Sequence, residues 1–237
     1  GNIDNMIKEL SVLLPLHNKE HCIEDTIKAL LSTNLIDKIQ IIIVENESTD
    51  NSLLTAEKVA RSMNAETDIT ILTSTKGKGN AIREGIPFIK YEWCLITGAD
   101  LPFGLTAIEF FSKSSKKYDL YLGSKGHPES IISRRFSRRI YSQFFYLLRK
   151  KFLKLNYLDT HGSMIARSKN LKEINKILVQ KEFFIDTEIV FNFEILKFRI
   201  IEIPVTLIND DRVSTVKPLI DGLKMLKETI ILGLRKK

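Results

Sequence analysis

The chain has 237 residues, of which 43% are hydrophobic and 27% are charged. This composition is enough for one large α/β domain with a buried core, and the 11 Gly and 6 Pro are too few for a disordered or low-complexity chain. The formal net charge of +7 suits nucleic acid, phosphorylated small molecules or an anionic membrane surface, and by itself it does not choose among them.

The two cysteines, Cys22 and Cys94, lie far apart and have no partner at metal-binding spacing. This spacing argues against a zinc site and favours two free thiols in a reducing compartment. No stretch reaches the roughly 18 apolar residues that span a bilayer, and no signal peptide is visible. We therefore expect a cytoplasmic protein, either soluble or peripheral on the inner face of a membrane.

In the first hundred residues, short apolar runs alternate with amphipathic segments. The runs predict strands at residues 10–16, 39–44, 68–73 and 92–97, and the segments between them predict helices at 21–33, at 52–63 and from a glycine turn at 76–79 to about residue 88. Strands that alternate with helices form right-handed βαβ units. The sequence therefore predicts an α/β fold with a mostly parallel central sheet flanked by helices, its unbroken apolar strands covered on both faces.

Polar clusters follow three of these strands, at residues 45–50, 76–80 and 98–102. In open α/β sheets, ligands bind at the carboxyl ends of the strands. Because all three clusters lie at such ends, we expect them to converge on one ligand site. This inference depends on no knowledge of a family.

The second half of the chain is more basic and more helical. It predicts strands at residues 118–123 and 199–207, and helices at 130–155, 182–198 and 216–234. The segment 130–155 interleaves many Arg and Lys with apolar side chains, as in an amphipathic helix with a cationic face. No internal repeat or linker is visible, so residues 1–237 are predicted to form one domain.

Four segments resemble, in order and spacing, the motifs of one enzyme family. Residues 13–20 (LLPLHNKE) are similar to a first strand followed by a P-x-x-N-E turn, and residues 44–50 (VENESTD) to V-D-D-G-S-x-D. Residues 76–81 (KGKGNA) are similar to G-K-G-x-A, and residues 98–102 (GADLP) occupy the place of D-x-D. Over about residues 10–215 the chain thus resembles the family 2 glycosyltransferases with the GT-A fold, a Rossmann-like nucleotide-diphospho-sugar transferase fold. Within that family it is most similar to the polyprenyl-phosphate hexose synthases, the dolichyl-phosphate mannose synthase group.

The resemblance implies which residues bind the nucleotide-sugar donor, a GDP- or UDP-hexose. They are Pro15, His17, Asn18, Glu20, Glu45, Asn46, Lys78, Gly79, Ala99 and Asp100. The first loop would contact the base and ribose, and glycines would let the turn at 77–79 approach a phosphate at a helix N-terminus. Glu45 replaces the family's first acidic residue and Glu47 its usual Gly, which leaves the shape of that loop open.

Asp100 is the candidate metal ligand. A divalent cation that bridges a diphosphate needs hard oxygen ligands and keeps several waters, so one carboxylate and two phosphate oxygens suffice for Mg²⁺ or Mn²⁺. Gly98 stands where the family has the first Asp, which leaves Asp100 alone and weakens the expected affinity. The structural alternative is that Asp100 only ends the strand.

The second half supplies the acceptor side that the resemblance implies. Lys125 lies in a segment similar to a phosphate-contacting G-S-R, where it offers a point charge in place of a guanidinium fork. Arg134 or Arg135 lies where the synthases carry an arginine facing the acceptor phosphate. His161 lies in a segment similar to one beside the acceptor site.

Two further residues carry roles in transfer. Asp186 is the candidate general base for a hydroxyl acceptor. A lipid phosphate is already anionic and needs little base catalysis, so Asp186 would then mainly orient it. Arg212 lies in a segment similar to a late loop that closes over the diphosphate, and it would stabilise the leaving group.

Each assignment has a structural alternative. Asn18 and Asp50 are common helix caps, Lys78 suits a solvated turn, and a lone histidine such as His161 is more often structural. A basic helix at 130–155 is usually a solvated face, although its density of Arg and its apolar interleaving favour function here.

The leading hypothesis is an inverting glycosyltransferase that moves a hexose to a polyprenyl phosphate at a membrane surface. In this organisation, residues 10–125 bind the donor, residues 126–215 bind the acceptor, and residues 216–237 form a C-terminal amphipathic helix for the membrane. One alternative is transfer to a saccharide hydroxyl with Asp186 as base, and another is donor binding without catalysis. Nucleic-acid binding is disfavoured because the aromatic-rich sheet motifs of RNA binders are absent. The sequence leaves the sugar, the base and the oligomeric state open.

Overall fold

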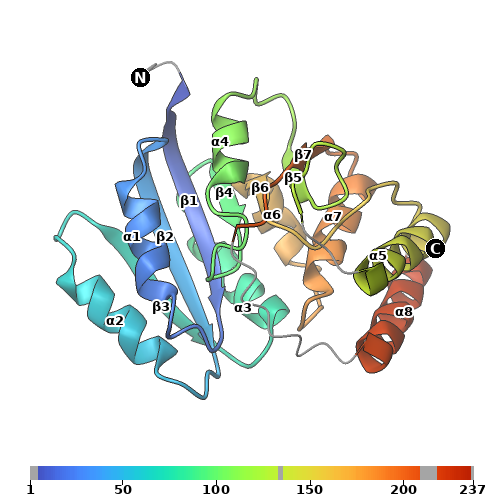
Figure 1. Cartoon of the computed structure of the whole chain (residues 1–237), viewed down its shortest axis with the longest axis horizontal. Helices are drawn as coiled ribbons and strands as arrows, with labels where there is room; N and C mark the ends of the chain where they lie inside the picture. The colour runs from blue at the N-terminus through green and yellow to red at the C-terminus, as the bar shows by residue number, and fades with distance from the viewer. Residues whose placement is uncertain (1–4, 133–135, 209–217, 236–237) are drawn as a thin grey trace.

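The computed structural model describes residues 5–132, 136–208 and 218–235, with the backbone alone for 136–141 and 218–219. The described residues form one seven-stranded sheet of order β3-β2-β1-β4-β6-β5-β7 (Figure 1). Its strands are β1 (Ile7–Leu16), β2 (Ile36–Asn46), β3 (Asp68–Ser74), β4 (Trp93–Ile96), β5 (Leu120–Ser124), β6 (Met164–Arg167) and β7 (Ile200–Pro204). The pairs among β1 to β4 are parallel, as is β5 with β7, whereas β6 runs antiparallel to β4 and β5. The mostly parallel α/β sheet is confirmed.

Helices cover both faces of this sheet. They are α1 (Ile23–Ser32), α2 (Ser52–Ser62), α3 (Lys78–Gly85), the 3₁₀ turn η2 (Ile86–Phe88), α4 (Thr106–Ser112), α5 (Phe136–Leu148), the π-helical turn η3 (Arg149–Leu153), α6 (Ser168–Asn175), α7 (Ile185–Ile195) and α8 (Pro218–Leu234). One apolar cluster packs α1, α2 and α4 against the sheet, and the other packs α3, α6 and α7 against the opposite face.

The central strands are buried on both sides because neighbouring residues point into opposite clusters. In β1, Val12 and Leu14 belong to one cluster and Leu13 to the other, and all three are fully buried. Alternating side chains of a strand point to opposite faces. The unbroken apolar runs of the sequence therefore identify doubly covered strands correctly.

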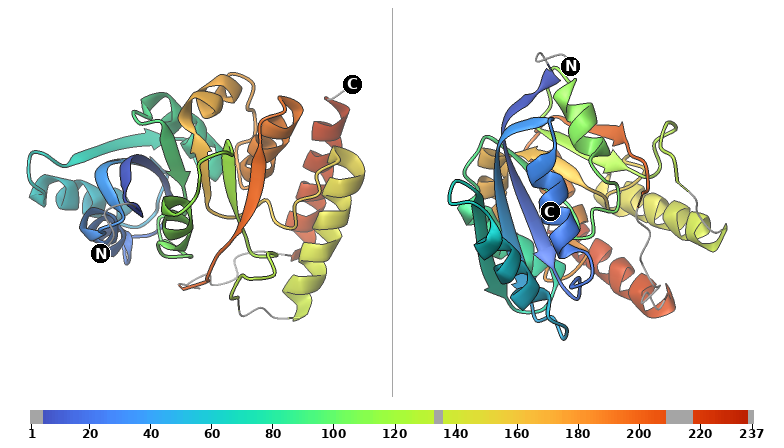
Figure 2. Two further views of the ribbon diagram at one scale, coloured as in Figure 1. Left: turned by 90° about the horizontal axis from the view of Figure 1, so that it is seen from above. Right: turned by 60° about the vertical axis from the view of Figure 1, so that its left-hand side comes forward.

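The helices α5 and α8 lie side by side, at the end of the sheet away from α2 (Figures 1 and 2). α8 also packs on η3, and the approach is close: a Cβ added to Gly233 would lie 2.8 Å from the carbonyl oxygen of Phe152. Among the described residues, no helix is both long and apolar enough to cross a membrane.

The structure corrects the predicted helix at residues 130–155. Ile131 forms a bridge with Thr206 instead, α5 begins at Phe136, and the chain turns π-helical from Arg149. The sequence also predicts no element at α4, β6 or α6. β6 has four residues and α4 has seven, which is too short for a periodic signal.

Arg149 departs from the predicted cationic face. Its side chain is only 5% exposed, and its Nη2 donates to the carbonyl oxygens of Tyr157 and Leu158, both at 3.3 Å. Burial lowers the pKa of this guanidinium, although Asp159 and Glu202 work against that shift. Arg149 therefore ties η3 to the loop that follows it.

Candidate active site

The topology brings the polar loops to one edge of the sheet. The carboxyl ends of β1, β2, β3, β4, β5 and β7 share this edge, and antiparallel β6 begins there. The loops after these strands and the loop at 159–163 before β6 therefore lie along the same edge. The predicted convergence of residues 45–50, 76–80 and 98–102 agrees with this arrangement.

The first two loops are fastened to each other by side chains from both. His17 Nδ1 lies 2.8 Å from the carbonyl oxygen of Asn46. Asn18 Oδ1 accepts the backbone N–H of Thr49 at 2.7 Å, and Ser48 Oγ accepts the backbone N–H of Asn18 at 3.0 Å. Within the second loop, Glu45 Oε1 accepts the N–H of Ser48 at 2.5 Å. Asn18 thus holds the neighbouring loop and does not cap α1, whose N-cap is Cys22.

Glu20 and Asp50 extend the same network toward α2. Glu20 Oε2 accepts the backbone N–H of Asn51 at 3.2 Å. Asp50 Oδ1 accepts the N–H of Ser52 at 2.9 Å and its hydroxyl at 2.5 Å. Asp50 therefore has the structural role, at the start of α2, that its sequence position allows.

The second loop also fixes the glycine turn. The buried Asn46 accepts the N–H of Gly77 on Oδ1 at 3.1 Å and donates from Nδ2 to Leu16 at 3.0 Å. Glu47, which stands where the family has Gly, accepts the N–H of Lys76 on Oε2 at 2.9 Å. Glu47 therefore joins the loop at 45–50 to the glycine turn at 76–80, although it departs from the motif.

Glycine is required in the turn that opens α3. Gly77 has φ +128°, and a Cβ there would lie 2.1 Å from the carbonyl oxygen of Lys181. A Cβ at Gly79 would lie 2.2 Å from that of Gln180. The turn therefore packs directly on the 180–181 backbone and leaves the N-terminus of α3 at the site edge, where helix N–H groups favour anions.

Asp100 is the acidic residue of the polar cluster at 98–102, which follows β4. Its side chain is 8% exposed, and its Oδ2 lies 3.8 Å from Lys19 Nζ. The hydroxyl of Thr26 donates to the carbonyl oxygen of Ala99 at 2.6 Å, which secures the loop to α1. A Cβ on Gly98 would lie 2.7 Å from Asp100 Oδ1, so the carboxylate occupies the space beside the glycine.

A divalent cation fits this donor set only as a site shared with substrate. No group of three His, Cys, Asp or Glu side chains that could hold a metal occurs in the part of the chain that the structure describes. Asp100 offers hard carboxylate oxygens, and Mg²⁺ commonly binds through one carboxylate together with substrate phosphates and water. The single carboxylate is thus compatible with a cation carried by a diphosphate.

Asp186 lies at the start of α7, close to the first residue of α3 and to the loop at 159–163. It is 1% exposed, its Oδ2 is 2.6 Å from Lys78 Nζ, and His161 Nδ1 is 3.8 Å from the same oxygen. Its other oxygen, Oδ1, is buried and has no hydrogen-bond partner among the described residues. Burial would raise the pKa of Asp186, but Lys78 and His161 outweigh it and hold that pKa below its ordinary value.

Lys125, which follows β5, is paired with Asp159 in the loop before β6. Its Nζ lies 2.7 Å from Asp159 Oδ2 and also donates to the carbonyl oxygen of His161. Asp159 accepts the backbone N–H of Lys125 at 3.0 Å and that of His161 at 2.9 Å. Although burial opposes it, this set of partners, led by the Lys125 charge, holds the pKa of Asp159 well below its usual range.

Of the remaining predicted residues, some lie in the described part of the chain and three do not. Pro15 lies at the end of β1, and His161 Nε2 is 3.3 Å from Thr187 Oγ1 on α7. Arg134, Arg135 and Arg212 lie outside the described residues. The structure thus brings Lys78, His161 and Asp186 together.

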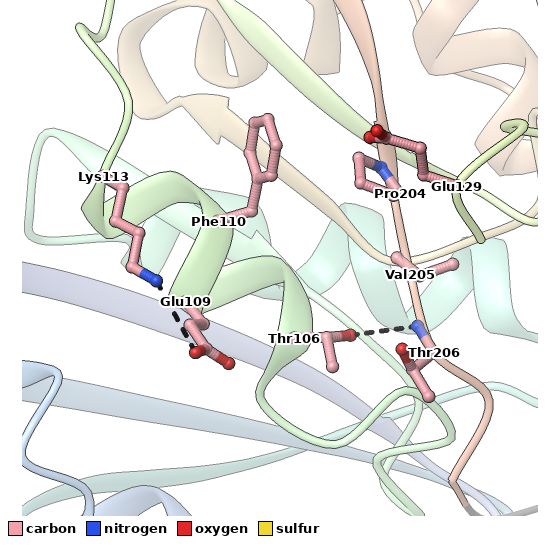
Figure 3. A pocket seen from close by; sticks show the side chains of 8 residues that line it. All are labelled: Thr106, Glu109, Phe110, Lys113, Glu129, Pro204, Val205 and Thr206. Carbon is pink, nitrogen blue, oxygen red and sulfur yellow. Dashed lines mark hydrogen bonds and ion pairs between the residues drawn. The ribbon is translucent and has the colours of Figure 1, made fainter. Parts of the chain in front are cut away.

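Two cavities lie apart from these side chains. One of about 260 Å³ lies between α4 and the end of β7 and is lined by Thr106, Phe110 and Thr206 among others (Figure 3). Thr106 Oγ1 there accepts the N–H of Thr206 at 3.4 Å. The other, of about 350 Å³, lies between β3 and α3. Neither is lined by a predicted site residue, and the candidate site is an open edge bordered by loops.

The sheet order, the loops at its carboxyl edge and the Asp100 carboxylate after β4 define an α/β protein of the GT-A type. The model of the family described as "Glycosyl transferase family 2" matches residues 11–174, and the chain belongs to this family. It is a glycosyltransferase, which confirms the family and the fold expected from the motifs.

Individual relatives agree with this membership. The chain is 24% identical over 253 residues to the dolichyl-phosphate β-glucosyltransferase of Dictyostelium discoideum, covering 98% of this chain and 76% of that protein. It is 32% identical over 117 residues to a poly-β-1,6-N-acetyl-D-glucosamine synthase of Staphylococcus epidermidis, covering 46% of this chain but only 27% of that protein.

Solved structures show the same fold. Glucosyl-3-phosphoglycerate synthase of Mycobacterium tuberculosis, in complex with UDP, superposes with a TM-score of 0.65 at 18% identity, covering 96% of this chain and 79% of that chain. The same synthase with Mn²⁺, UDP and glucosyl-3-phosphoglycerate gives a TM-score of 0.65 at 17% identity, again covering 96% and 79%. At such identities the likeness shows the fold alone.

Proposed function

We propose that the chain transfers a hexose from a nucleoside-diphosphate sugar to a polyprenyl phosphate at a membrane surface, with inversion at the anomeric carbon. The observation that carries this proposal is the contact between Lys78, at the start of the donor-side helix α3, and Asp186, on the acceptor side. A donor diphosphate at α3 and an acceptor at α7 would thus be neighbours, as direct displacement requires.

On the donor side, the fastened loops would bind the nucleotide. His17, Asn18, Glu20 and Glu45 would border a base and ribose along the ends of β1 and β2, and the buried Asn46 would hold the second loop and the glycine turn in place. Pro15 and Ala99 would form the walls of this part of the site, and Lys78 and Gly79 would face the diphosphate at the N-terminus of α3.

Asp100 would hold the Mg²⁺ or Mn²⁺ that accompanies the diphosphate. Such a cation supplies charge neutralisation for the leaving group. The fold neighbour from Mycobacterium tuberculosis has been crystallised with UDP and either Mn²⁺ or Mg²⁺, which supports a cation-assisted donor site in this fold.

In the proposed reaction, an acceptor oxygen forms the new bond to the anomeric carbon as the bond from that carbon to the diphosphate oxygen breaks. The bonding electron pair leaves with the diphosphate, whose charge Lys78 and Arg212 would stabilise. A phosphate oxygen is already anionic, so Asp186 would orient the acceptor and not deprotonate it. Lys125, Arg134, Arg135 and His161 would position the acceptor phosphate.

The pair of helices α5 and α8 supports a membrane-bound acceptor. Both carry exposed apolar side chains, namely Phe144, Leu147, Ile220, Leu223, Ile230 and Leu234. Exposed cations accompany them, namely Lys150, Lys151, Lys154, Lys224, Lys227 and Arg235. Exposed apolar side chains together with exposed cations suit the interface of an anionic bilayer. The Dictyostelium relative, named for a dolichyl phosphate, supports the same acceptor class.

The test is a transfer assay with purified protein, Mg²⁺ or Mn²⁺, radiolabelled GDP-mannose, UDP-glucose or UDP-N-acetylglucosamine, and a polyprenyl phosphate. We expect a labelled lipid product with one of these donors. Neither transfer nor donor hydrolysis with any of them would overturn the proposal. Donor binding in a thermal-shift titration without turnover would favour the alternative of a non-catalytic binding protein.

A second candidate is transfer to a saccharide hydroxyl. It is favoured by the buried, unpartnered Oδ1 of Asp186 described above, since a base must accept a proton from the attacking hydroxyl. The partial match to a polysaccharide synthase agrees with it. Asp186→Asn discriminates between the two: it should nearly abolish transfer to a hydroxyl but only reduce transfer to a phosphate.

A further inference from the structure

The segment at residues 179–181 lies between the glycine turn and the two last helices. On one side, the carbonyl oxygens of Gln180 and Lys181 are the atoms on which Gly79 and Gly77 pack. The N–H of Asn80, in the first turn of α3, donates to the carbonyl oxygen of Lys181 at 3.1 Å. The shape of the glycine turn is therefore set by the position of this backbone.

On its other side, the segment is held by one buried carboxylate. Glu188 is 1% exposed, and its Oε1 accepts the backbone N–H groups of Val179 and Gln180, both at 3.0 Å. Burial raises the pKa of Glu188 in spite of these two bonds. The Glu188 carboxyl group is thus held in a buried position that disfavours its charge, next to residues 179–181, on which the glycine turn packs.

Helix α8 reaches the same segment. Glu228 Oε2 accepts the side-chain N–H of Gln180 from Nε2 at 2.8 Å. Arg235 Nη1 lies 3.7 Å from Glu188 Oε2. Helix α8 is thereby connected to residues 179–181 by polar contacts of Gln180 and Glu188, and the glycine turn packs on the backbone of the same segment.

We propose that Glu188 is a positioning residue for the donor diphosphate: it fixes residues 179–181, on which the Gly77–Gly79 turn packs, and α8 supports it through Glu228 and Arg235. This inference rests on the proposed function, which makes the glycine turn the diphosphate site. It implies that the position of α8 influences donor affinity. Contact of α8 with a surface or partner would then change the position of the Gly77–Gly79 turn.

A matched pair of variants separates positioning from charge. Glu188→Gln keeps a side-chain oxygen that accepts both N–H groups, whereas Glu188→Met fills a similar volume but accepts neither. We expect Glu188→Gln to bind UDP or GDP, with Mg²⁺, within about three-fold of the wild type. Glu188→Met should bind the same nucleotide about ten-fold or more weakly, because two N–H groups lose a strong acceptor.

Kinetics and hydrogen exchange distinguish this role from general destabilisation. Glu188→Met should raise the donor KM and leave the acceptor KM unchanged, with a smaller effect on kcat. Amide exchange in the peptides covering 76–82 and 179–182 should accelerate in Glu188→Met and not in Glu188→Gln. Glu194→Met, which removes an exposed carboxylate from the same helix, is the control and should change neither peptide.

The outcomes decide between the two proposals separately. Unchanged nucleotide affinity and unchanged exchange at 76–82 in Glu188→Met would overturn the role of Glu188. If the wild type bound neither UDP nor GDP, the proposed function would fail, while the exchange comparison would still test the positioning. If Glu188→Met does not fold, Glu228→Ala against Glu228→Gln tests the same path from α8: the alanine variant alone should weaken nucleotide binding, by about three-fold, and equal affinities would contradict the link.

Discussion

Lys78 Nζ lies 2.6 Å from Asp186 Oδ2, so the cation that opens α3 is paired with the carboxylate that opens α7. Lys78 is 22% exposed and Asp186 only 1%, which places the pair at the boundary between solvent and core. An anionic diphosphate at the N-terminus of α3 would compete with Asp186 for this lysine. In the proposed function, the protonation of Asp186 would therefore depend on whether a diphosphate is bound beside Lys78.

The first prediction concerns Lys78→Met. Since Lys78 helps to hold the pKa of Asp186 below its ordinary value against burial, its removal should raise that pKa. For a hydroxyl acceptor, where Asp186 must be ionised to act as base, the acid limb of the pH profile of kcat/KM should move to higher pH. The donor KM should also rise about ten-fold. Lys76→Met, which removes a neighbouring exposed cation, is the control, and an unmoved acid limb would show that Asp186 does not titrate in turnover.

The second prediction concerns Asp100, the proposed metal ligand. Because a Cβ on Gly98 would lie 2.7 Å from Asp100 Oδ1, Gly98→Ala should displace the carboxylate without removing it. We expect Gly98→Ala to weaken Mn²⁺ binding in the presence of UDP or GDP several-fold, and Asp100→Asn to weaken it about ten-fold or more. Titration of bound Mn²⁺ by electron paramagnetic resonance measures both. Equal Mn²⁺ affinity in the wild type and Asp100→Asn would exclude Asp100 as a ligand.

Much of the fold can be predicted from the sequence because it lies in local patterns. The β-branched run at residues 39–44 and its polar continuation at 45–50 indicate both a strand and the position of its loop. The place of Asp100 in a loop is indicated in the same way, since its polar segment comes after a buried strand. The four-residue β6 gives no such signal, and its antiparallel direction depends on distant partners.

The parts of the site that could not be predicted depend on contacts between distant residues. Lys125 and Asp159 are 34 residues apart, and no local pattern pairs them. Arg149 reads as part of a basic face until the structure shows it buried under its own loop. Glu188 is one acidic residue in a motif-like stretch, and its two N–H partners become visible only with the 179–180 backbone in place.

The third prediction concerns stability in acid. The folded pKa of Asp159 is lowered from its ordinary value of 3.8, so its ionised form stabilises the fold. This contribution is present above the ordinary value and is lost as the pH falls below it, through the lower folded pKa. Urea midpoints measured from pH 7 to pH 2 should thus fall less steeply below pH 4 in Asp159→Asn than in the wild type.

Lys125→Met tests the same pair from its other side. It leaves the Asp159 carboxylate buried without its cation, and such a loss costs about 3–5 kcal/mol. The variant should therefore unfold at a lower urea concentration at pH 7, and part of the difference should disappear when Asp159 is protonated in acid. If Lys125→Met unfolded at the same urea concentration as the wild type at pH 7, the stabilising role of the pair would be contradicted.

The last prediction concerns the proposed membrane face of α5 and α8. Leu223 on α8 is 60% exposed, and Leu54 on α2, at the other end of the sheet, is 61% exposed. Leu223→Glu removes apolar area and adds a negative charge where the proposed face meets anionic lipid, whereas Leu54→Glu makes the same change away from it. In sedimentation with phosphatidylglycerol vesicles, we expect Leu223→Glu to lower the partition coefficient about ten-fold or more and Leu54→Glu to leave it near the wild-type value. The wild type should bind weakly to phosphatidylcholine vesicles, and weakly to phosphatidylglycerol vesicles at high salt. In both cases the attraction between its cations and the lipid headgroups is lost or screened. Equal losses in the two variants would show that apolar exposure in general, and not the α5–α8 face, drives the association.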